Sequence, residues 1–555
     1  MRVAIDYVIN KNPELLDQVF GLRVAIFNWL KAYLRYGRQE RFYFLIDEPA
    51  AWREVQELAA SVGCDPARLT AFDRRFVQEN YNQFSTIFRA DPVAQELLWR
   101  REKIPDPGYN FCGLAHAISG LETGTLLEQY CLSPAQKTDA IICPSRAVQS
   151  SIRSFLDLYA EYIEKRFNTT YRCPIQLPLI PLGIDVDKFE KITTPAKRAE
   201  QRVKLGLTDQ DIVILWVGRL SHSTKAHPLA MFQSAERAAI KTGARVHLIM
   251  LGYFAPETDE PHFRNLAKDI CKLAQISFIS HKDPRFPDGL WAAGDIFISL
   301  VDNFQESYGL TPIEAMAAGL PRVISDWDGY KDSVEQGVDG FLVTTRQPPP
   351  GQGEALSDLL LSGLDLYAGY LAKAATTVTI DQEEAANHLA TLINDPELRK
   401  SFAARAREKA RKIYDWRNII PRMEDFWAEM AAQRRKDCVG ASRINWPALP
   451  PQAPDPYTMY ASYPTKSLGE DNKIELIADQ ETTRMLWRHE LNVFSLDIMI
   501  HPDRVLELIA TLNKHGPMTI GQLKSAFARD NEEGRYWRTV AWLIKLGIVG
   551  ILPHK

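Results

Sequence analysis

Residues 295–319 read DIFISLVDNFQESYGLTPIEAMAAG. The first seven form a nearly continuous apolar run, which is typical of a strand buried on both faces of a parallel sheet. A polar loop follows, and then a helix is expected to begin with Thr311 as its N-cap and Pro312 as its first residue, and to end at Gly319. We therefore predict a strand, a loop and a helix in direct succession, which is the repeating unit of doubly wound α/β sheets.

The same alternation surrounds this segment. A helix is predicted at Pro228–Lys241, a loop at Gln347–Gly353, and helices at Tyr367–Ile393 and Pro396–Ile413. Strands are predicted at Ile212–Val217, Val246–Leu251, Ile276–Ser280, Asp295–Val301, Pro321–Ile324 and Gly340–Val343. This pattern indicates a Rossmann-like domain over residues 191–413.

An earlier set of elements predicts a second Rossmann-like domain over residues 1–190. Its helix candidate is Phe20–Leu34, whereas the pattern from Asp73 to Asn110 is unclear. Its strand candidates are Arg2–Ile9, Arg41–Ile46 and Ala140–Cys143. The fold class expected for the main body is therefore α/β, with two doubly wound sheets.

The end of the chain has a different pattern. A helix at about 414–432 is interrupted at Pro421, where we expect a kink. Six prolines between Pro447 and Pro464 predict a stiff linker over 440–475. Residues 476–555 then show helices at Asp503–Lys514, Ile520–Ala528 and Gly534–Leu546 and a short strand at Gly547–Leu552, an order that suggests a winged-helix-like module.

Composition excludes several classes of protein. The 555 residues are 46% hydrophobic and 25% charged, with 30 Gly and 33 Pro, so global disorder and a collagen-like structure are excluded. The net charge of −4 does not indicate a polyanion-binding protein. Seven Cys without a CxxC pair argue against a disulfide framework or a zinc site and favour a reducing compartment.

The same evidence predicts a cytoplasmic location. No run of 18 apolar residues is present, and the opening MRVAIDYVIN has the pattern of a first strand and not of a signal peptide. The basic stretch Arg399–Lys412 is expected to be a solvated helix face, and its alternative is a peripheral contact with the inner face of the membrane.

Two clusters follow strands of the second domain. In the first, the amides of Gly309, Leu310 and Thr311 would point at an anion at the helix start, with Glu306 in the loop and Glu314 in the helix. The alternative is that Thr311 and Glu314 form a capping box, which would make Glu314 structural.

The second cluster is VGRLSHSTK, residues 217–225. Gly218 permits a tight exit from the strand, and Arg219 and Lys225 place two cations at the carboxyl edge of the sheet. A diphosphate that leaves water needs such neutralisation, whereas isolated cations on a surface are usually only solvated.

Together these motifs resemble the large family 4 group of retaining glycosyltransferases, which have the GT-B architecture of two facing Rossmann-like domains. The resemblance implies that residues 1–190, with the return helix at about 414–432, form the acceptor domain and that residues 191–413 form the nucleotide-sugar donor domain. The resemblance covers roughly residues 1–430 and is most specific over 212–343, including Ser325–Val343 (SDWDGYKDSVEQGVDGFLV). Leu179–Phe189 resembles the interdomain linker of the family, and YDWRNIIPRMEDFW, residues 414–427, resembles the terminal helix that crosses back to the first domain.

The resemblance implies roles for the clustered residues. Arg219 and Lys225 would hold the donor diphosphate, and Glu306 would contact the transferred sugar. Glu314 would bind the ribose hydroxyls, while Gly309 and its neighbours donate amides to the phosphates. Ala226 departs from the family, which usually has Gly after the lysine.

The first domain adds two residues by resemblance. His116, in GLAHAISG at Gly113–Gly120, corresponds to the family's histidine near the donor sugar, although a lone His among apolar neighbours is more often a core residue. Gly21, in Phe20–Ala25, stands where relatives carry a Gly-rich loop, but no second Gly accompanies it.

Two acidic motifs have simpler interpretations. Asp185 and Asp187 have the form of a metal-binding pair, but an Asp before a helix is usually a cap, and no metal is assigned. Asp326–Gly329 is expected to be a loop built on turn chemistry, with Gly329 near the donor or acceptor sugar.

The resulting hypothesis is a retaining, metal-independent glycosyltransferase that uses a UDP-, GDP- or ADP-sugar and no other cofactor. Its alternatives are a GT-B epimerase or phosphorylase, or a sugar-nucleotide-responsive regulator. Residues 476–555 hold ten Lys/Arg against nine Asp/Glu, and a helix at 534–546 is half apolar, so nucleic acid is not the expected partner. We expect this module to pack, to form a homo-oligomer or to dock a protein partner.

Overall fold

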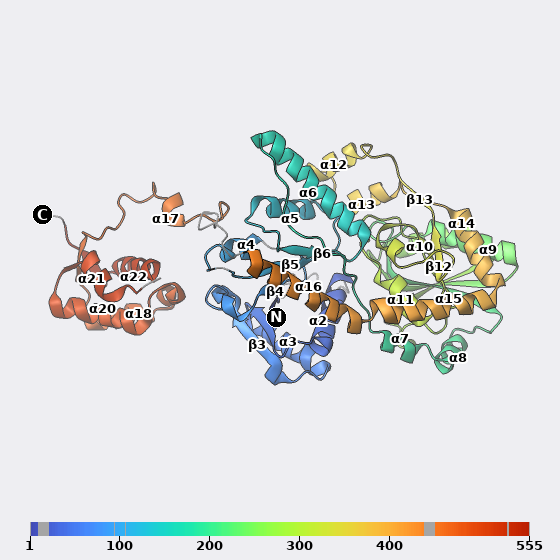
Figure 1. The fold of residues 1–555 in the computed structure, drawn as a ribbon, viewed down its shortest axis with the longest axis horizontal. Helices are drawn as coiled ribbons and strands as arrows, with labels where there is room; N and C mark the ends of the chain where they lie inside the picture. Colours follow the sequence, from blue (N-terminus) through green and yellow to red (C-terminus); the bar gives the residue numbers. More distant parts are fainter. Residues whose placement is uncertain are drawn as a thin grey trace. The chain divides into compact units, whose positions relative to one another are not determined.

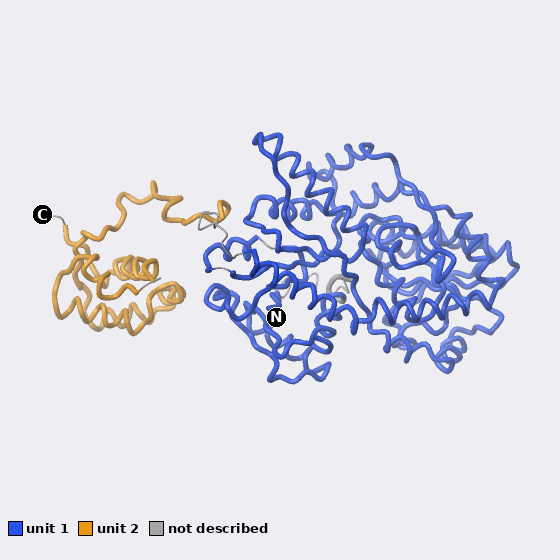
Figure 2. Tube along the Cα trace, in the orientation of Figure 1, with its two compact units in different colours: residues 1–448 blue, residues 449–555 orange. Residues whose placement is uncertain are grey.

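The computed structural model describes residues 2–8, 21–93, 95–105, 107–437, 450–529 and 532–553. The chain forms two compact units, residues 1–448 and residues 449–555 (Figure 2). The first unit contains both of the large sheets, and the second is a small helical module with its own sheet (Figure 1).

The first sheet has six parallel strands in the order β3-β2-β1-β4-β5-β6. These are β1 (Val3–Asp6), β2 (Phe42–Ile46), β3 (Leu69–Asp73), β4 (Thr86–Phe88), β5 (Asn110–Leu114) and β6 (Ala140–Ile142). In the register of the central strands, Ile5 lies beside Phe44 on one side and Phe88 on the other. This strand order is that of a doubly wound Rossmann fold.

Helices cover both faces of the first sheet. They are α2 (Gly21–Tyr36), α3 (Pro49–Ser61), α4 (Gln95–Arg101), α5 (Leu121–Leu132) and α6 (Arg146–Phe167). Ile5 and Phe88 point to the α2 side, whereas Ala4 and Ile87 point to the α5–α6 side, as the alternation along a strand requires. The segment from Asp73 to Asn110, which sequence could not resolve, contains β4, α4 and short 3-10 turns at Arg74–Phe76 and Tyr81–Gln83.

The second sheet repeats the architecture of the first. Its six strands are parallel, in the order β12-β11-β10-β7-β8-β9, which is the same winding. They are β7 (Asp211–Leu220), β8 (Arg245–Phe254), β9 (Gln275–Ser280), β10 (Ile296–Ser299), β11 (Arg322–Ser325) and β12 (Gly340–Val343). The predicted fold class of two Rossmann-like domains is therefore confirmed.

The helices of the second domain also largely match the prediction. They are α7 (Val186–Ile192), α8 (Pro195–Lys204), α9 (Leu229–Thr242), α10 (Asp259–Ile270), α11 (Leu310–Ala318), α14 (Gln382–Asn394) and α15 (Pro396–Lys409). The helix predicted over Tyr367–Ile393 is wrong as one element. It is broken into α13 (Tyr367–Ala375) and α14 by the short strand β14 (Thr379–Ile380), because the β-branched run from Thr376 to Thr379 favours extended backbone.

A helical hairpin is inserted before that break. The strand β13 (Thr345–Arg346) pairs with β14, and α12 (Glu354–Leu361) and α13 lie between these two strands in the chain. None of the residues of α12 is buried, so this helix rests on the surface of the domain. In Figure 1 the hairpin lies at the upper edge of the second domain.

The chain then returns to the first domain. After a π-turn at Ala410–Tyr414, α16 (Trp416–Asp437) packs against α2, β4 and β5. The ring of Trp427 lies 5.1 Å from that of Phe88 and 6.0 Å from that of Tyr33, measured between centroids. The helix runs on through Pro421.

The second unit is built on a three-stranded sheet of order β16-β15-β17, whose pairs are antiparallel. Its elements are α17 (Pro456–Met459), β15 (Lys473–Leu476), α18 (Gln480–Arg488), α19 (Glu490–Val493), α20 (Pro502–His515), β16 (Met518–Thr519), α21 (Ile520–Phe527), α22 (Glu533–Lys545) and β17 (Val549–Ile551). The strand β15 begins three residues before the predicted module boundary at 476. Residues 440–449 of the predicted linker lie outside the described residues.

No helix among the described residues is long and apolar enough to cross a membrane.

Candidate functional site

The two predicted clusters lie at the same edge of the second sheet. The strands β7 and β10 are parallel neighbours, with Ile214 beside Ile296 and Leu215 beside Phe297. Their carboxyl ends lead into residues 221–228 and 300–309, so the loops that carry Lys225 and Glu306 meet at this edge. In open α/β sheets this edge is where ligands bind.

Lys225 and Glu306 form an ion pair between the Nζ and Oε2 atoms. Their side chains are only 19% and 12% exposed. Burial alone would raise the pKa of Glu306, but Lys225 and the amides of Ser307 and Tyr308 outweigh it and hold this pKa below the usual range. Burial disfavours the ammonium of Lys225, yet Glu306 prevails and raises its pKa. Both groups are therefore charged at neutral pH.

Arg219 reaches the same loop. Its Nη2 atom donates to the backbone oxygen of Thr224 and to Oε1 of Gln305, each at 2.9 Å. Both cations predicted from the sequence thus contact the 305–306 segment, and Gln305 is an addition that the sequence did not single out. The strand β7 runs through Gly218 and Arg219 to Leu220, longer than predicted. At Gly218 the carbonyl oxygen lies 1.8 Å from where a Cβ on Gly252 would be, so β7 and β8 approach closely there.

The start of α11 differs from the prediction. Gly309, not Thr311, is the N-cap, and the helix begins at Leu310. Gly309 has a φ of +88°, and a Cβ there would lie 2.3 Å from the ring of Tyr330. The left-handed turn brings the chain into the helix two residues early. No side chain caps this helix, so the capping box of Thr311 and Glu314 is absent.

Glu314 lines a cavity of about 300 Å³ in the first unit. Leu310 lies one turn earlier on the same helix face, and Lys188 lines the cavity beside them. Burial raises the pKa of Glu314 to about 7, and Lys188 and Lys225 oppose this rise. Lys31 and Arg35 of α2 also line this cavity. In the sequence, Lys31 and Arg35 stand four residues apart on one helix, a spacing that puts both cations on the same face and could have marked them as site residues.

The candidate residues of the first domain are less completely described. His116 is half-buried just beyond β5, and its Nε2 atom lies 2.5 Å from the carbonyl oxygen of Ala90. Burial lowers its pKa against the effect of that carbonyl, so the imidazole is neutral at pH 7. Gly21 is the first residue of α2, and residues 9–20 before it lie outside the described residues.

One contact ties the His116 segment to the second domain. The Ser119 Oγ atom lies 2.8 Å from the hydroxyl of Tyr367, at the start of α13. Burial raises the pKa of Tyr367, and the nearby guanidinium of Arg219 opposes that rise. The His116 segment, α13 and Arg219 are therefore neighbours.

Two further carboxyl groups belong to this region, Asp302 in the loop of Glu306 and Asp328 close to Glu306 itself. Burial raises the pKa of Asp302 to about 7, although it accepts a hydrogen bond from the His227 amide at 3.2 Å. Burial, with the Glu306 carboxylate, raises the pKa of Asp328 to about 8. Asp328 has a φ of +48°, in the left-handed region. The DWDG motif marks this turn in the sequence, but its proximity to Glu306 could not be inferred from it.

The other sequence motifs have structural roles. Asp185 accepts from the Lys188 amide and caps α7, as expected. Asp187 pairs with Arg411 and Arg417. Across the described ranges, no group of three or more His, Cys, Asp or Glu is placed to hold a metal ion.

The basic stretch at 399–412 also makes contacts within its domain. Arg399 donates to the Ile393 carbonyl at 2.9 Å, Arg407 donates to that of Ala318 at 2.9 Å, and Lys409 pairs with Asp339 at 2.9 Å. Several of its cations are thus occupied in holding the second domain together.

The candidate site lies in a part of the chain that matches a known protein family. Residues 197–366 match the model of the family described as Glycosyl transferases group 1. This range contains Arg219, Lys225, Glu306 and Glu314.

Curated relatives match about a third of the chain. The D-inositol 3-phosphate glycosyltransferase of Geodermatophilus obscurus is 29% identical over 209 residues, which are 35% of this chain and 44% of that protein. The enzyme of the same name from Mycobacteroides abscessus is 31% identical over 189 residues, 34% of this chain and 40% of that one. Spore coat protein SA of Bacillus subtilis is 29% identical over 188 residues, 32% and 48% of the two chains. The chain thus matches less than half the length of these relatives.

Solved structures give a more extended but distant likeness. HepE of Anabaena, in complex with UDP, is 17% identical and has a TM-score of 0.48, over 77% of this chain and 100% of that chain. WaaG, a glycosyltransferase involved in lipopolysaccharide biosynthesis, is 14% identical with a TM-score of 0.42, over 76% and 98%.

Proposed function

We propose that this protein is a retaining glycosyltransferase that moves a sugar from a nucleotide-sugar donor to an acceptor hydroxyl. The observation that carries the proposal is the Lys225–Glu306 ion pair at the carboxyl edge of the second sheet, with Arg219 in the same loop cluster. The family match over residues 197–366 supports the same reaction class.

The geometry suits the departure of a nucleoside diphosphate. Charge develops on the diphosphate as the bond to the sugar breaks, and preorganised cations and amides stabilise that charge without reorganisation. Lys225 and Arg219 supply the cations, and the amides at the start of α11 supply a helix N-terminus directly after Gly309. Glu306, held by Lys225, would then face the transferred sugar.

The proton balance needs no further group. The acceptor oxygen forms the new bond to the anomeric carbon as the bond from that carbon to the diphosphate breaks. The acceptor proton passes to the leaving diphosphate on the same face, so the configuration at the anomeric carbon is retained. Neutral His116, in the segment that touches α13, would lie beside the sugar from the first domain.

The nucleoside would occupy the cavity beside α11. Glu314 lines that cavity, where a ribose would offer two hydroxyl donors to a carboxylate, and Lys188 and Lys31 add positive charge. A UDP-sugar is the donor that we propose to test first, since HepE of Anabaena was solved with UDP.

Nucleotide binding followed by product analysis tests the proposal. We expect UDP, GDP or ADP to raise the melting temperature of the full chain, because a ligand that binds only the folded state stabilises it. The matching nucleotide sugar is then incubated with candidate acceptors, and the anomeric configuration of the product is read by NMR.

Variants separate this site from a coincidental one. Glu306→Gln and Lys225→Ala should each lower transfer by orders of magnitude while the protein remains folded. Glu383→Gln, on the exposed Lys241–Glu383 pair of the same domain, is the control. Wild-type turnover in either site variant contradicts the assignment of Lys225 and Glu306 to the active site. Release of an epimerised or phosphorolysed sugar without an acceptor favours a GT-B epimerase or phosphorylase instead.

A further inference from the structure

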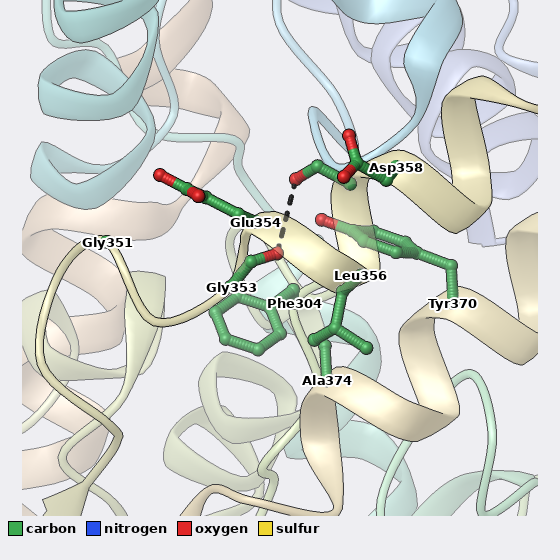
Figure 3. A pocket seen from close by; sticks show the side chains of 9 residues that line it. Phe304, Gly351, Gly353, Glu354, Leu356, Asp358, Tyr370 and Ala374 are labelled. Atoms are coloured by element: carbon green, nitrogen blue, oxygen red, sulfur yellow. Dashed lines mark hydrogen bonds between the residues drawn. The ribbon is translucent and has the colours of Figure 1, made fainter.

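A second pocket, of about 520 Å³, lies on the α12–α13 hairpin (Figure 3). Phe304 forms one wall and belongs to the loop of Glu306, two residues away. Opposite walls come from α12, with Leu356, and from α13, with Tyr370. The pocket therefore opens beside the proposed reacting centre and is built by a hairpin that is inserted between β13 and β14.

The wall formed by Phe304 is fixed from behind. Its ring meets that of Trp327 edge to face, with 5.2 Å between centroids. The indole Nε1 of Trp327 donates to the backbone oxygen of Asn303 at 3.2 Å. Phe304 is nevertheless 36% exposed, so a rigid aromatic face is presented to whatever enters the pocket.

The polar groups of the pocket are acidic or neutral. Glu354 and Asp358 line it, and among the described residues neither carboxylate has an ion-pair or hydrogen-bond partner for its side chain. The hydroxyl of Tyr370 points toward the same space (Figure 3). No cation lines the pocket, and Lys373 of α13 is already bonded to Asp365 at 2.7 Å.

The hairpin is also linked to both sides of the proposed reacting centre. Tyr367, which opens α13, contacts Ser119 of the His116 segment at 2.8 Å. It is also close enough to Arg219 for the guanidinium to affect its ionisation. A ligand in this pocket would thus extend toward the place where donor diphosphate and sugar are proposed to sit.

On the basis of the proposed function, we infer that this pocket is the acceptor subsite and that it takes an unphosphorylated saccharide, either neutral or bearing an amino group. Sugar hydroxyls and an ammonium group donate hydrogen bonds, and two unpaired carboxylates accept them. The apolar face of a sugar ring can stack on an aromatic ring such as that of Phe304. A phosphate or sulfate on this part of the acceptor would meet two like charges and no cation to offset them.

The test uses the labelled full-length protein on an array of neutral, amino, sulfated and phosphorylated saccharides. The array is run with and without the nucleotide that stabilises the protein. We expect the strongest signals from neutral or amino saccharides. In Glu354→Gln/Asp358→Asn these signals should fall by about tenfold or more, because two charge-assisted hydrogen bonds are weakened.

A matched control changes two carboxylates elsewhere. Glu397→Gln/Glu408→Gln alters two exposed residues of α15 and should bind the array as the wild type does. All variants alter exposed side chains, so their melting temperatures should stay close to that of the wild type.

Three results would overturn the inference: the strongest signals on phosphorylated or sulfated saccharides, no saccharide signal at all, or a site double variant that binds within twofold of the wild type. Failure of the proposed function looks different. In that case no nucleotide shifts the melting temperature and no nucleotide sugar is consumed, whatever the array shows.

Discussion

Replacing Lys225 by Met removes the partner of a nearly buried carboxylate. Glu306 is 12% exposed and stays in place through its loop, so Lys225→Met leaves a charge with little solvent around it. Breaking such a pair from one side costs about 3 kcal/mol of unfolding free energy. Glu306→Gln leaves the ammonium of Lys225 in the same position, and the double variant Lys225→Met/Glu306→Gln leaves neither charge.

The expected coupling energy follows from these values. At an effective dielectric constant of about 20, two unit charges about 4 Å apart attract each other by about 4 kcal/mol. Couplings of contacting residues reach only about 3 kcal/mol, so we expect a coupling energy of about 2 kcal/mol or more. The lowered pKa of Glu306 means that its contribution is present at neutral pH and lost as pH falls through its folded-state pKa. The raised pKa of Lys225 keeps its contribution in place until alkaline pH. The coupling should therefore be constant around pH 7 and shrink in acid.

The double-mutant cycle is measured by calorimetric unfolding at pH 7, without nucleotide. The control cycle uses Lys241 and Glu383, a pair at 2.6 Å whose side chains are 36% and 55% exposed. Surface pairs of this kind couple by less than about 1 kcal/mol. If the Lys225–Glu306 cycle is additive within about 0.5 kcal/mol, the reasoning about this site is refuted.

The other predictions concern the turn, a buried acid and the core. Gly309→Ala places a Cβ 2.3 Å from the Tyr330 ring and should reduce the rise in melting temperature that nucleotide gives. The control Gly206→Ala, at a φ of +68° with no atom within 4 Å of its Cβ, bears only the backbone strain of about 1–2 kcal/mol, so an equal reduction in both variants would contradict this prediction. The pKa of Asp302 is raised to about 7, so the unfolding free energy of the wild type falls as pH rises toward 7. Between pH 5 and pH 8, the unfolding free energy of Asp302→Asn should therefore rise by about 3 kcal/mol relative to that of the wild type, and a calorimetric difference that does not change with pH would disprove this. Trp427→Ala should lower the unfolding free energy by about 3–5 kcal/mol, because the side chain is 0% exposed. A loss of less than about 1 kcal/mol in thermal unfolding would show that the first domain does not depend on the packing of α16.

Most of the second domain could be predicted because its central strands, such as β10 and β11, are buried on both faces. A short run rich in β-branched residues, such as IVILWV, is typical of a buried strand, and each of the six predicted strands is found. The first domain was harder to predict from Asp73 onward, because β4 has only three residues and α4 only seven. Elements this short leave no periodicity to detect.

The site shows where local patterns stop being informative. Sequence placed Lys225 and Glu306 after two strands, and β-sheet topology brought them together, as expected. It placed the helix start at Thr311 because Thr-Pro is a strong N-terminal signal, but the left-handed turn at Gly309 prevailed through its fit against Tyr330. The nearness of Asp328 to Glu306 depends on tertiary packing, which no local rule encodes.

The return of α16 has a consequence for how the protein is made. Trp427 and Met423 fill the core between α2 and the first sheet, and Met423 accepts a hydrogen bond from the indole of Trp29 at 3.3 Å. The amino-terminal lobe therefore cannot complete its interior until the ribosome has released some 430 residues, among them the whole of the other lobe. During translation, the nascent amino-terminal lobe would therefore expose this gap in its core until α16 emerges, whereas every element of the other lobe emerges before α16.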